Sequence, residues 1–120
     1  MGQETLQQPW VNWNEVLSAV GDDVGSLREL ATLFLDAMPR HMAAIREALQ
    51  RDDWPTVAHE SHAVKGQIAF FTKDEPYLAA RLAVNTARAG EEDACRSACC
   101  RLALLLDQLI SEILKQTEGS

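Results

Sequence analysis

The chain has 120 residues, of which 47% are hydrophobic and 24% charged, and its formal net charge is −7. This composition is ordinary for a globular protein, and the length suits a single domain with a hydrophobic core of its own. A chain this acidic would repel the phosphates of nucleic acids and the anionic lipids of a membrane surface. We therefore expect neither nucleic acid nor membrane among its partners.

The three cysteines, Cys95, Cys99 and Cys100, lie together in one stretch with helical periodicity. An odd number of clustered cysteines is not typical of a disulfide framework, and core packing of Cys95 and Cys99 is the simpler interpretation. No apolar run approaches the roughly 20 residues that span a bilayer, and residues 1–10 lack the pattern of a secretory signal. These features predict a cytoplasmic protein.

Apolar residues recur at intervals of three and four along the chain, and no alternating β-branched run predicts a strand. We expect a flexible tail over residues 1–10. A short helix should follow over residues 13–19, with Asn12 as its N-cap and Gly21 as its stop signal.

A long second helix is predicted to begin at Asp22 or Asp23, because a carboxylate stabilises the positive N-terminal end of a helix. Pro39 lies inside this helix, so we expect a kink there or a break with a restart. One apolar stripe runs along it, formed by Leu27, Leu30, Phe34, Met38, Met42, Ile45 and Leu49.

A third helix should have Asp52 or Asp53 as its N-cap and Pro55 in its first turn, and should end near Phe71. Its apolar residues recur at intervals of three and four, which predicts a face directed at the core. This core-facing stripe consists of Trp54, Val57, Ser61, Val64, Ile68 and Phe71.

A fourth helix is predicted from Pro76 to the Gly90 stop signal, and a last helix over residues 91 to about 115. Four long amphipathic helices with short connections predict an all-α fold, an antiparallel four-helix bundle with a short extra N-terminal helix. We expect this bundle to occupy residues 11–116 and a flexible tail to occupy residues 117–120.

Helical geometry separates the two histidines of the segment VAHESHAVKGQ, residues 57–67. At about 100° per residue, His62 lies roughly 130° from the centre of the core-facing stripe, and His59 lies nearly opposite it. Lys65 follows on the flank of His62, with Gly66 beside it. Glycine in mid-helix costs about 1 kcal/mol relative to alanine, so we expect it to give a partner access to the imidazole.

An exposed imidazole with a cation nearby suits phosphorylation of a ring nitrogen, because neutral histidine is an effective nucleophile near neutral pH. SHAVKG, residues 61–66, resembles the His-x-x-Lys-Gly motif of the histidine-containing phosphotransfer (HPt) family. Phe34 and Pro39 match the Phe-x4-Pro signature of that family's preceding helix. The LREL-x3-FL, LQRDDW and ARAGEE segments also fall where the family has them, and the resemblance covers about residues 11–116.

The resemblance implies a role for each residue of the motif. His62 corresponds to the phosphorylated histidine, Lys65 to the residue that neutralises the phosphoryl charge, and Gly66 to the small residue that opens the site. Gln67 stands where the family usually has a small residue, and could donate a hydrogen bond to the phosphoryl oxygens. The chain also departs from the family in two pairs of residues: Phe71 and Thr72 replace a frequent glycine, and Ala83 and Val84 lie where an acidic residue is frequent.

The family also implies partners. A receiver domain of a response regulator would give its phosphoryl group to His62, a second receiver would accept it, and a hybrid sensor histidine kinase would stand upstream. The receiver would supply Mg²⁺, so we expect no cofactor in this chain, no autokinase activity and no classical enzyme. We expect docking to use Ala58, Ala63 and Ala69 together with the Pro39-containing helix, and a monomer suits a shuttle.

Other interpretations fit the residues less well. His59 and His62 are three apart and not the four of an HExxH zinc site, and no histidine follows a glutamate by three, so we predict no metal site. No nucleotide-binding or hydrolase motif occurs, and His41 is most simply a solvent or rim residue. The main alternative is a non-catalytic acidic helical-bundle interaction or scaffold module, in which His62 would be dispensable.

Overall fold

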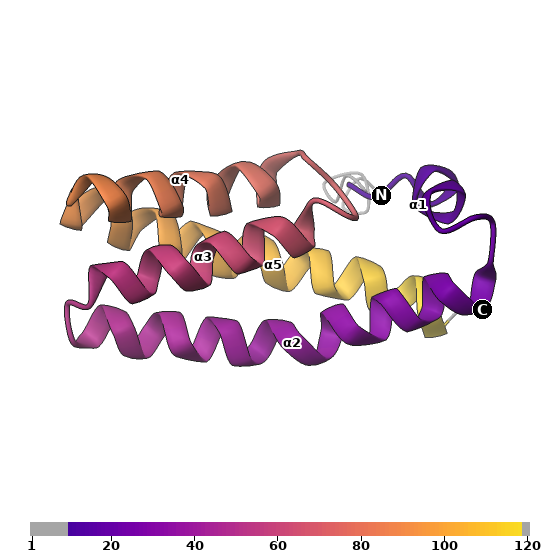
Figure 1. The fold of residues 1–120 in the computed structure, drawn as a ribbon, viewed down its shortest axis with the longest axis horizontal. Helices are drawn as coiled ribbons and strands as arrows, with labels where there is room; N and C mark the ends of the chain where they lie inside the picture. Colours follow the sequence, from indigo (N-terminus) through magenta and orange to yellow (C-terminus); the bar gives the residue numbers. More distant parts are fainter. Residues whose placement is uncertain (1–9, 119–120) are drawn as a thin grey trace, which may run out of the picture.

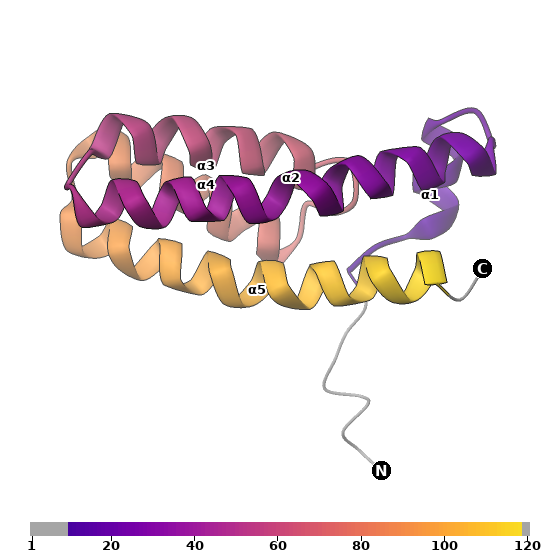
Figure 2. The same cartoon turned by 90° about the horizontal axis from the view of Figure 1, so that it is seen from below.

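The computed structural model describes residues 10–118, and this part of the chain is helical with no strand. The helices are α1 (Trp13–Ala19), α2 (Val24–Gln50), α3 (Trp54–Ile68), α4 (Glu75–Ala89) and α5 (Glu92–Glu118). Figures 1 and 2 show that α2 to α5 form an antiparallel bundle, and that α1 lies where α2 and α5 extend beyond α3 and α4. The predicted all-α four-helix bundle with a short extra N-terminal helix is confirmed.

The predicted tails span residues 1–10 and 117–120, of which residues 117 and 118 belong to α5, while 1–9 and 119–120 lie outside the described residues. Residues next to them are ordered by contacts with the bundle. The Glu112 carboxylate of α5 accepts the backbone N–H groups of Trp10 and Val11, each at 2.9 Å. None of the helices described here combines the length and the hydrophobicity that a bilayer-spanning segment needs.

Side chains cap three helices at the positions that the sequence indicates. The Asn12 side chain accepts the N–H of Glu15 at the start of α1. Asp23 and Asp53 cap α2 and α3, and each also accepts the hydroxyl of the residue three positions later, Ser26 or Thr56. These hydroxyl hydrogen bonds are the main reason that the pKa of both carboxyl groups lies below its usual range.

Two helix ends differ from the predictions. α3 ends at Ile68 and not near Phe71, because the N–H groups of Phe71 and Thr72 both turn back to the Ile68 carbonyl. α5 continues to Glu118, beyond the predicted end near Lys115. Both differences arise at the end of the bundle near α1, where tertiary contacts add to local propensity.

The sequence predicts either a kink at Pro39 or a break with a restart. α2 continues through Pro39 without a break, so the second outcome does not occur. Figure 1 shows that the two halves of α2 are inclined to each other. Proline lacks the N–H that would bond the preceding turn, which accounts for a bend at this position. Pro39 itself is exposed, so its ring costs the core no packing.

The core runs the full length of the bundle and contains the predicted apolar faces. Phe71 connects α1 and α2 to the end of α3. Its ring packs edge to face against Trp13 of α1 and Phe34 of α2, with 6.1 Å and 5.0 Å between ring centroids. The largest fully buried side chains are Phe34, Met38, Ile45, Val57, Val64, Ile68, Pro76, Val84, Leu102, Leu106, Leu109 and Ile113.

The predicted core cysteines are confirmed, since Cys95 and Cys99 are buried and Cys100 is exposed. Burial and the neighbouring Cys95 raise the pKa of the Cys99 thiol to about 12. The buried side chains of α4, which packs against this part of α5, are mainly small. They let α4 approach α3 and α5 closely. They are Ala79, Ala80, Ala83 and Ala87.

Candidate functional site

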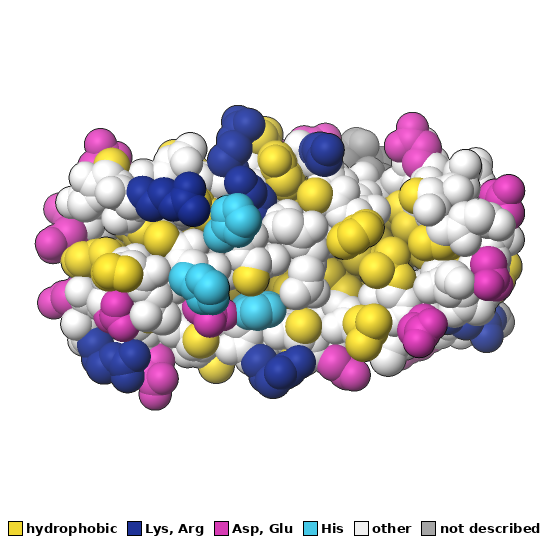
Figure 3. Space-filling model, viewed as in Figure 1, with side chains coloured by type: hydrophobic (Ala, Val, Ile, Leu, Met, Phe, Trp, Pro, Cys, Tyr) yellow, Lys and Arg dark blue, Asp and Glu magenta, His cyan; other side chains and the backbone are white. Residues whose placement is uncertain are grey.

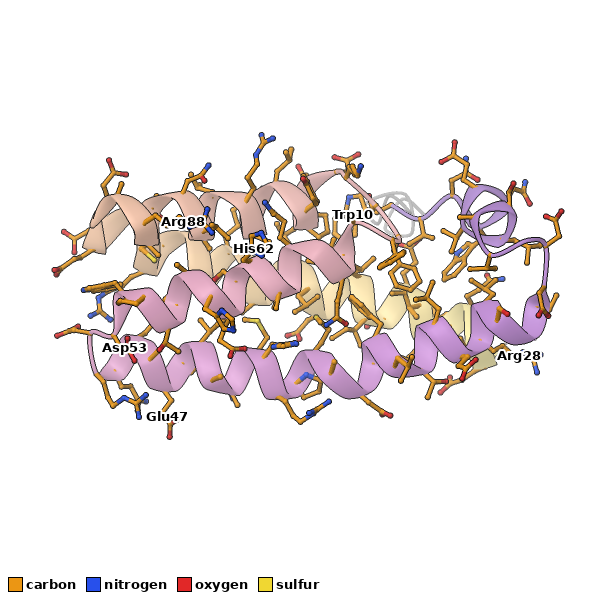
Figure 4. The ribbon with its side chains drawn as sticks, in the orientation of Figure 1. Trp10, Arg28, Glu47, Asp53, His62 and Arg88 are labelled. Atoms are coloured by element: carbon orange, nitrogen blue, oxygen red, sulfur yellow. The ribbon has the colours of Figure 1, made fainter. Side chains whose placement is uncertain are left out.

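His62 lies on the outward face of α3, as predicted (Figure 4). Its imidazole is exposed, while Ser61 and Val64, one residue before it and two after it, are fully buried. His59 is also exposed. The core-facing stripe therefore holds α3 in one rotational setting and displays the His62 ring to solvent.

One flank of α3 faces α2. His41 of α2 lies between two side chains of α3, with its Nδ1 2.7 Å from Oε1 of Glu60 and its Nε2 3.3 Å from the amide nitrogen of Gln67. The prediction for His41 was a solvent or rim residue, and it is a half-buried rim residue with two partners. Periodicity along one helix does not reveal this cluster, because Glu60 and Gln67 are 19 and 26 residues from His41 along the chain.

The opposite flank of α3 carries Lys65. At about 100° per residue, Lys65 lies about 140° around the helix from Glu60 and about 160° from Gln67. Because Glu60 and Gln67 face α2, Lys65 is on the side towards α4. Lys65 is half-buried, and His62 one turn before it is exposed, which places the cation between the imidazole and α4.

α4 contributes further positive charge beside this flank. Glu75 pairs with Arg101 of α5 at 3.9 Å, so that side of α4 faces α5. Arg88 lies about 140° around α4 from Glu75 and therefore on the side towards α3. Figure 4 shows the Arg88 side chain on the same face of the molecule as His62. The sequence did not indicate Arg88 as a neighbour of His62 either, because its proximity depends on how α3 and α4 pack.

The charge around His62 is uneven. In the space-filling view of this face, lysine and arginine side chains gather next to the histidines over α3 and α4 (Figure 3). Within residues 10–118, neither Lys65 nor Arg88 forms an ion pair, whereas Glu60 on the other flank is paired with His41. A chain of net charge −7 thus keeps unpaired cations beside one exposed imidazole.

Gly66 leaves open space on this face. Beyond its own helix backbone and chain neighbours, no heavy atom lies within 4 Å of the point that a Cβ at residue 66 would occupy. Its φ angle is not in the left-handed region, so neither backbone conformation nor packing requires glycine here. Gly66 lies about 40° around α3 from His62, so the space that its missing side chain leaves empty is on the outward face beside the imidazole.

Gln67 is not beside His62. It lies about 140° around α3 from His62, and its amide contacts His41. To donate a hydrogen bond to a group on His62, as the sequence suggests, the amide would have to leave His41. The structure therefore gives Gln67 a contact between α2 and α3.

The three alanines predicted to contact a partner are not equally accessible. Ala58 is only 8% exposed and belongs to the core, because it falls on the side of α3 that packs against α4. This burial argues against Ala58 as a docking residue. Ala63 and Ala69 are half-buried, and Ala69 shares the face of His62 two turns further along.

Apolar surface that the sequence did not single out lies beyond Ala69. The side chain of Phe70 is 60% exposed. Together with Ala69 and Phe71 it lines a shallow groove of about 350 Å³ between the end of α3 and α1. Leu78 of α4 is also exposed, at 43%, whereas Leu82, at 50%, lies about 20° around α4 from Glu75 and so on the side towards α5. A partner that covers His62 would have apolar surface to bury on this side of the molecule.

Among the described residues, no group of three or more His, Cys, Asp or Glu side chains is arranged to hold a metal ion. The chemistry that this face offers is a nucleophilic nitrogen with cations beside it. That combination suits the acceptance of an anionic, transferable group such as phosphoryl.

Comparison with known proteins gives one match. The family model described as the Hpt domain matches residues 29–112, more than half of the chain, from the first turns of α2 to the last turns of α5. The matched range contains His62, Lys65 and Gly66. No curated protein and no solved structure matches the chain.

Proposed function

Because the chain belongs to the Hpt domain family, we propose that it relays a phosphoryl group between the aspartates of two receiver domains through His62. Hpt domains take part in histidine phosphotransfer in two-component phosphorelays, as phosphocarriers and not as classical enzymes. They interact with the receiver and kinase domains of these systems. For this chain we propose receivers of response regulators as direct partners and a hybrid sensor histidine kinase upstream.

The observation that carries the proposal is the setting of His62. It is exposed on α3 with a half-buried lysine one turn away, and its neighbour Gly66 has no packing role. Three features that each occur by chance on helices coincide at one imidazole. A scaffold module would need none of them.

Each transfer is an exchange of one bond at phosphorus. The Nε2 lone pair of neutral His62 attacks the phosphoryl group of a receiver phospho-aspartate, the P–N bond forms, and the bond to the carboxylate oxygen breaks. In the second transfer the carboxylate of another receiver attacks, and the electron pair of the P–N bond returns to Nε2. Nδ1 can keep its proton throughout, so neither step requires a general base in this chain.

Lys65 and Arg88 offset the charge of the phosphoryl group. An anion of nearly two charges gains about 1 to 4 kcal/mol per unit charge from a cation at contact distance near a protein surface. We propose that Lys65 provides most of this, with Arg88 second. The receiver would bring Mg²⁺, so this chain needs no cofactor of its own.

Docking of the receiver would use the small residues Ala63 and Ala69, the exposed Phe70 and part of α2 near Pro39. We propose that the protein acts as a monomer in the cytoplasm, where free thiols such as its cysteines are stable. Its lack of a nucleotide-binding motif predicts that ATP alone leaves it unlabelled.

Incubation with a phosphorylated receiver tests the proposal. The wild-type chain should acquire acid-labile label, as expected of a phosphohistidine, and His62→Gln should fold normally and acquire none. His59→Gln, a change of an exposed histidine on the same helix, is the matched control and should label like wild type. Labelled His62→Gln would overturn the assignment, and a wild-type chain that binds receivers without accepting label would be a scaffold module.

The cations can be ranked in the same assay. Lys65→Ala should slow transfer by roughly tenfold, since one ionic contact to the phosphoryl group is worth about 1 kcal/mol or more. Arg88→Gln should have a smaller effect in the same direction. Arg28→Gln, on the distant first turns of α2, is the control and should leave the rate unchanged. If Lys65→Ala transferred the phosphoryl group at the wild-type rate, Lys65 would be only a solvated side chain on the flank of α3, with no role in the transfer.

A further inference from the structure

A cluster between α2 and α3 is not used by the proposed transfer. Nδ1 of His41 is 2.7 Å from a carboxylate oxygen of Glu60, and its Nε2 is 3.3 Å from the Gln67 amide nitrogen. The side chains of His41 and Glu60 are 25% and 21% exposed, so the pair is mostly shielded from solvent. Both ring nitrogens of His41 therefore have partners on α3.

The hydrogen bonds of this cluster are mutually consistent. If Nδ1 of His41 carries the proton, it donates to Glu60, and the bare Nε2 accepts from the Gln67 amide. The Gln67 amide thereby helps to hold the imidazole in the orientation that bonds Glu60. The arrangement fixes the Glu60 carboxylate on the flank of α3 that faces α2.

Glu60 is only two residues before His62. Residues two apart on a helix point to nearly opposite sides, so the paired carboxylate is directed away from His62. Without its partner on α2 it would be free to adopt rotamers that reach the outward face. There it would repel a phosphoryl group on His62, because like charges within about 10 Å interact appreciably at ordinary ionic strength.

We propose that His41 is a positioning residue, which holds the Glu60 carboxylate against α2 and so keeps negative charge away from the phosphoryl group on His62. This inference rests on the proposed function of His62 and adds a residue that the transfer chemistry itself does not touch. His62 then has Lys65 of α3 and Arg88 of α4 on the side towards α4, while the Glu60 carboxylate stays paired on the side towards α2.

Three variants test this role through the rate of phosphoryl gain from a phosphorylated receiver. His41→Ala should slow the reaction by roughly three- to tenfold, the range expected for one misplaced charge near the surface. Glu60→Gln should react at close to the wild-type rate. The double variant His41→Ala/Glu60→Gln should recover to within about twofold of wild type, because the released side chain is then neutral.

Two observations separate this role from a merely structural one. If His41 had only a structural role, the double variant would not recover. The glutamine that replaces Glu60 cannot restore the contact between α2 and α3 that is lost with the His41 side chain. The defect of His41→Ala should also shrink in about 1 M salt, where the screening length falls to about 3 Å. A defect that persists in high salt, or that Glu60→Gln does not relieve, would overturn the proposal.

Controls keep the outcome decisive. His59→Ala removes an exposed histidine of α3 and should leave the rate unchanged. If His41→Ala does not fold, His41→Leu keeps the volume of the side chain while removing both hydrogen bonds, and the same comparisons apply. Wild type and His62→Gln are measured in parallel. If the wild-type chain gains no phosphoryl group, the proposed function is refuted. If wild type reacts normally and His41→Ala reacts at the same rate, only the role of His41 is refuted.

A readout independent of transfer completes the test. The ¹⁵N shifts of the His41 ring distinguish its tautomers, and the neutral ring should carry its proton on Nδ1 because Glu60 accepts there. Glu60→Ala should move the ring towards the Nε2–H tautomer that free histidine prefers. A ring that already has its proton on Nε2 in the wild type would contradict the arrangement on which the proposal depends.

Discussion

At the scale of single residues, Gly66 is a position where the packing of the fold does not require glycine. A Cβ would meet no neighbour there, and the backbone is ordinary helix. Glycine in the interior of a helix nonetheless lowers stability relative to alanine. Packing therefore does not explain its presence next to His62, and we propose that it gives a partner access to the imidazole.

Gly66→Ala should raise the free energy of unfolding by about 0.5 to 1 kcal/mol, because alanine loses less backbone entropy in a helix. The same change should slow phosphoryl gain, and the bulkier Gly66→Gln should slow it further. Chemical denaturation gives the first quantity, and the labelling rate gives the second.

Gly25 offers a matched control for this opposition of stability and rate. It lies in the first turn of α2, where a Cβ would be in ordinary contact with the Asp23 side chain at 3.4 Å. Gly25→Ala should leave the labelling rate unchanged. If Gly66→Ala labels as fast as Gly25→Ala and Gly66→Gln does too, steric access is not the reason for the glycine.

At the scale of helices, the N-caps show which boundaries depend on local sequence. Asp53 reaches the N–H and the hydroxyl of Thr56, three residues away, so nothing distant is needed to form the cap. Such caps could be predicted from sequence to within one residue. The end of α3 could not, because Phe71 turns out of the helix to pack between Trp13 and Phe34.

The Asp53 cap should contribute stability in a pH window that can be stated. Its hydrogen bonds to Thr56 lower the pKa of the folded state below the ordinary value of 3.8, so folding favours the ionised form. The contribution is therefore present above that value and is lost as the pH falls through the lower, folded value. Wild type should have a higher Tm than Asp53→Asn near neutral pH, and the difference should shrink as the pH falls below 3.8.

Asparagine caps helices but does not titrate, which makes Asp53→Asn a control for the charge alone. Asp53→Ala, which removes the cap as well, should have a lower Tm than Asp53→Asn at every pH. A Tm difference between wild type and Asp53→Asn that stays constant from neutral to acid pH would contradict the assigned shift.

The site follows the same division between local and distant information. His62, Lys65 and Gly66 lie on one helix, so periodicity alone predicts that they share an outward flank. His41 and Arg88 reach this face from α2 and α4, and their positions depend on how the helices pack. The direction of Gln67, by contrast, follows from the same periodicity, which places it about 140° around α3 from His62, and only its contact with His41, 26 residues away, depends on packing.

At the scale of the whole molecule, the acidic charge and the basic flank have complementary consequences. A net charge of −7 disfavours binding to nucleic acid and to other acidic surfaces. The unpaired cations near His62 make that face an exception. A partner that presents a phosphorylated, acidic pocket would therefore be attracted to this face more than to the rest of the surface.

Different contacts attach the two ends of the bundle to its core. At one end, Trp13 packs on Phe71, and Glu112 holds the backbone of Trp10. At the other end, Arg96 of α5 lies over the Trp54 ring at 5.1 Å and also pairs with Asp52. One continuous cluster of buried residues connects the two ends.

We expect both ends to unfold in a single transition, because neither has a core of its own. The tryptophans permit a direct measurement: Trp54→Phe leaves fluorescence only from Trp10 and Trp13, and Trp10→Phe/Trp13→Phe leaves only Trp54. In each variant the fluorescence midpoint in urea should coincide with the midpoint of helix loss by circular dichroism. If the fluorescence of Trp10 and Trp13 changed at lower urea than the helix signal of the same variant, α1 would detach before the bundle unfolds. The groove between α1 and the end of α3 would then open without loss of the site at His62.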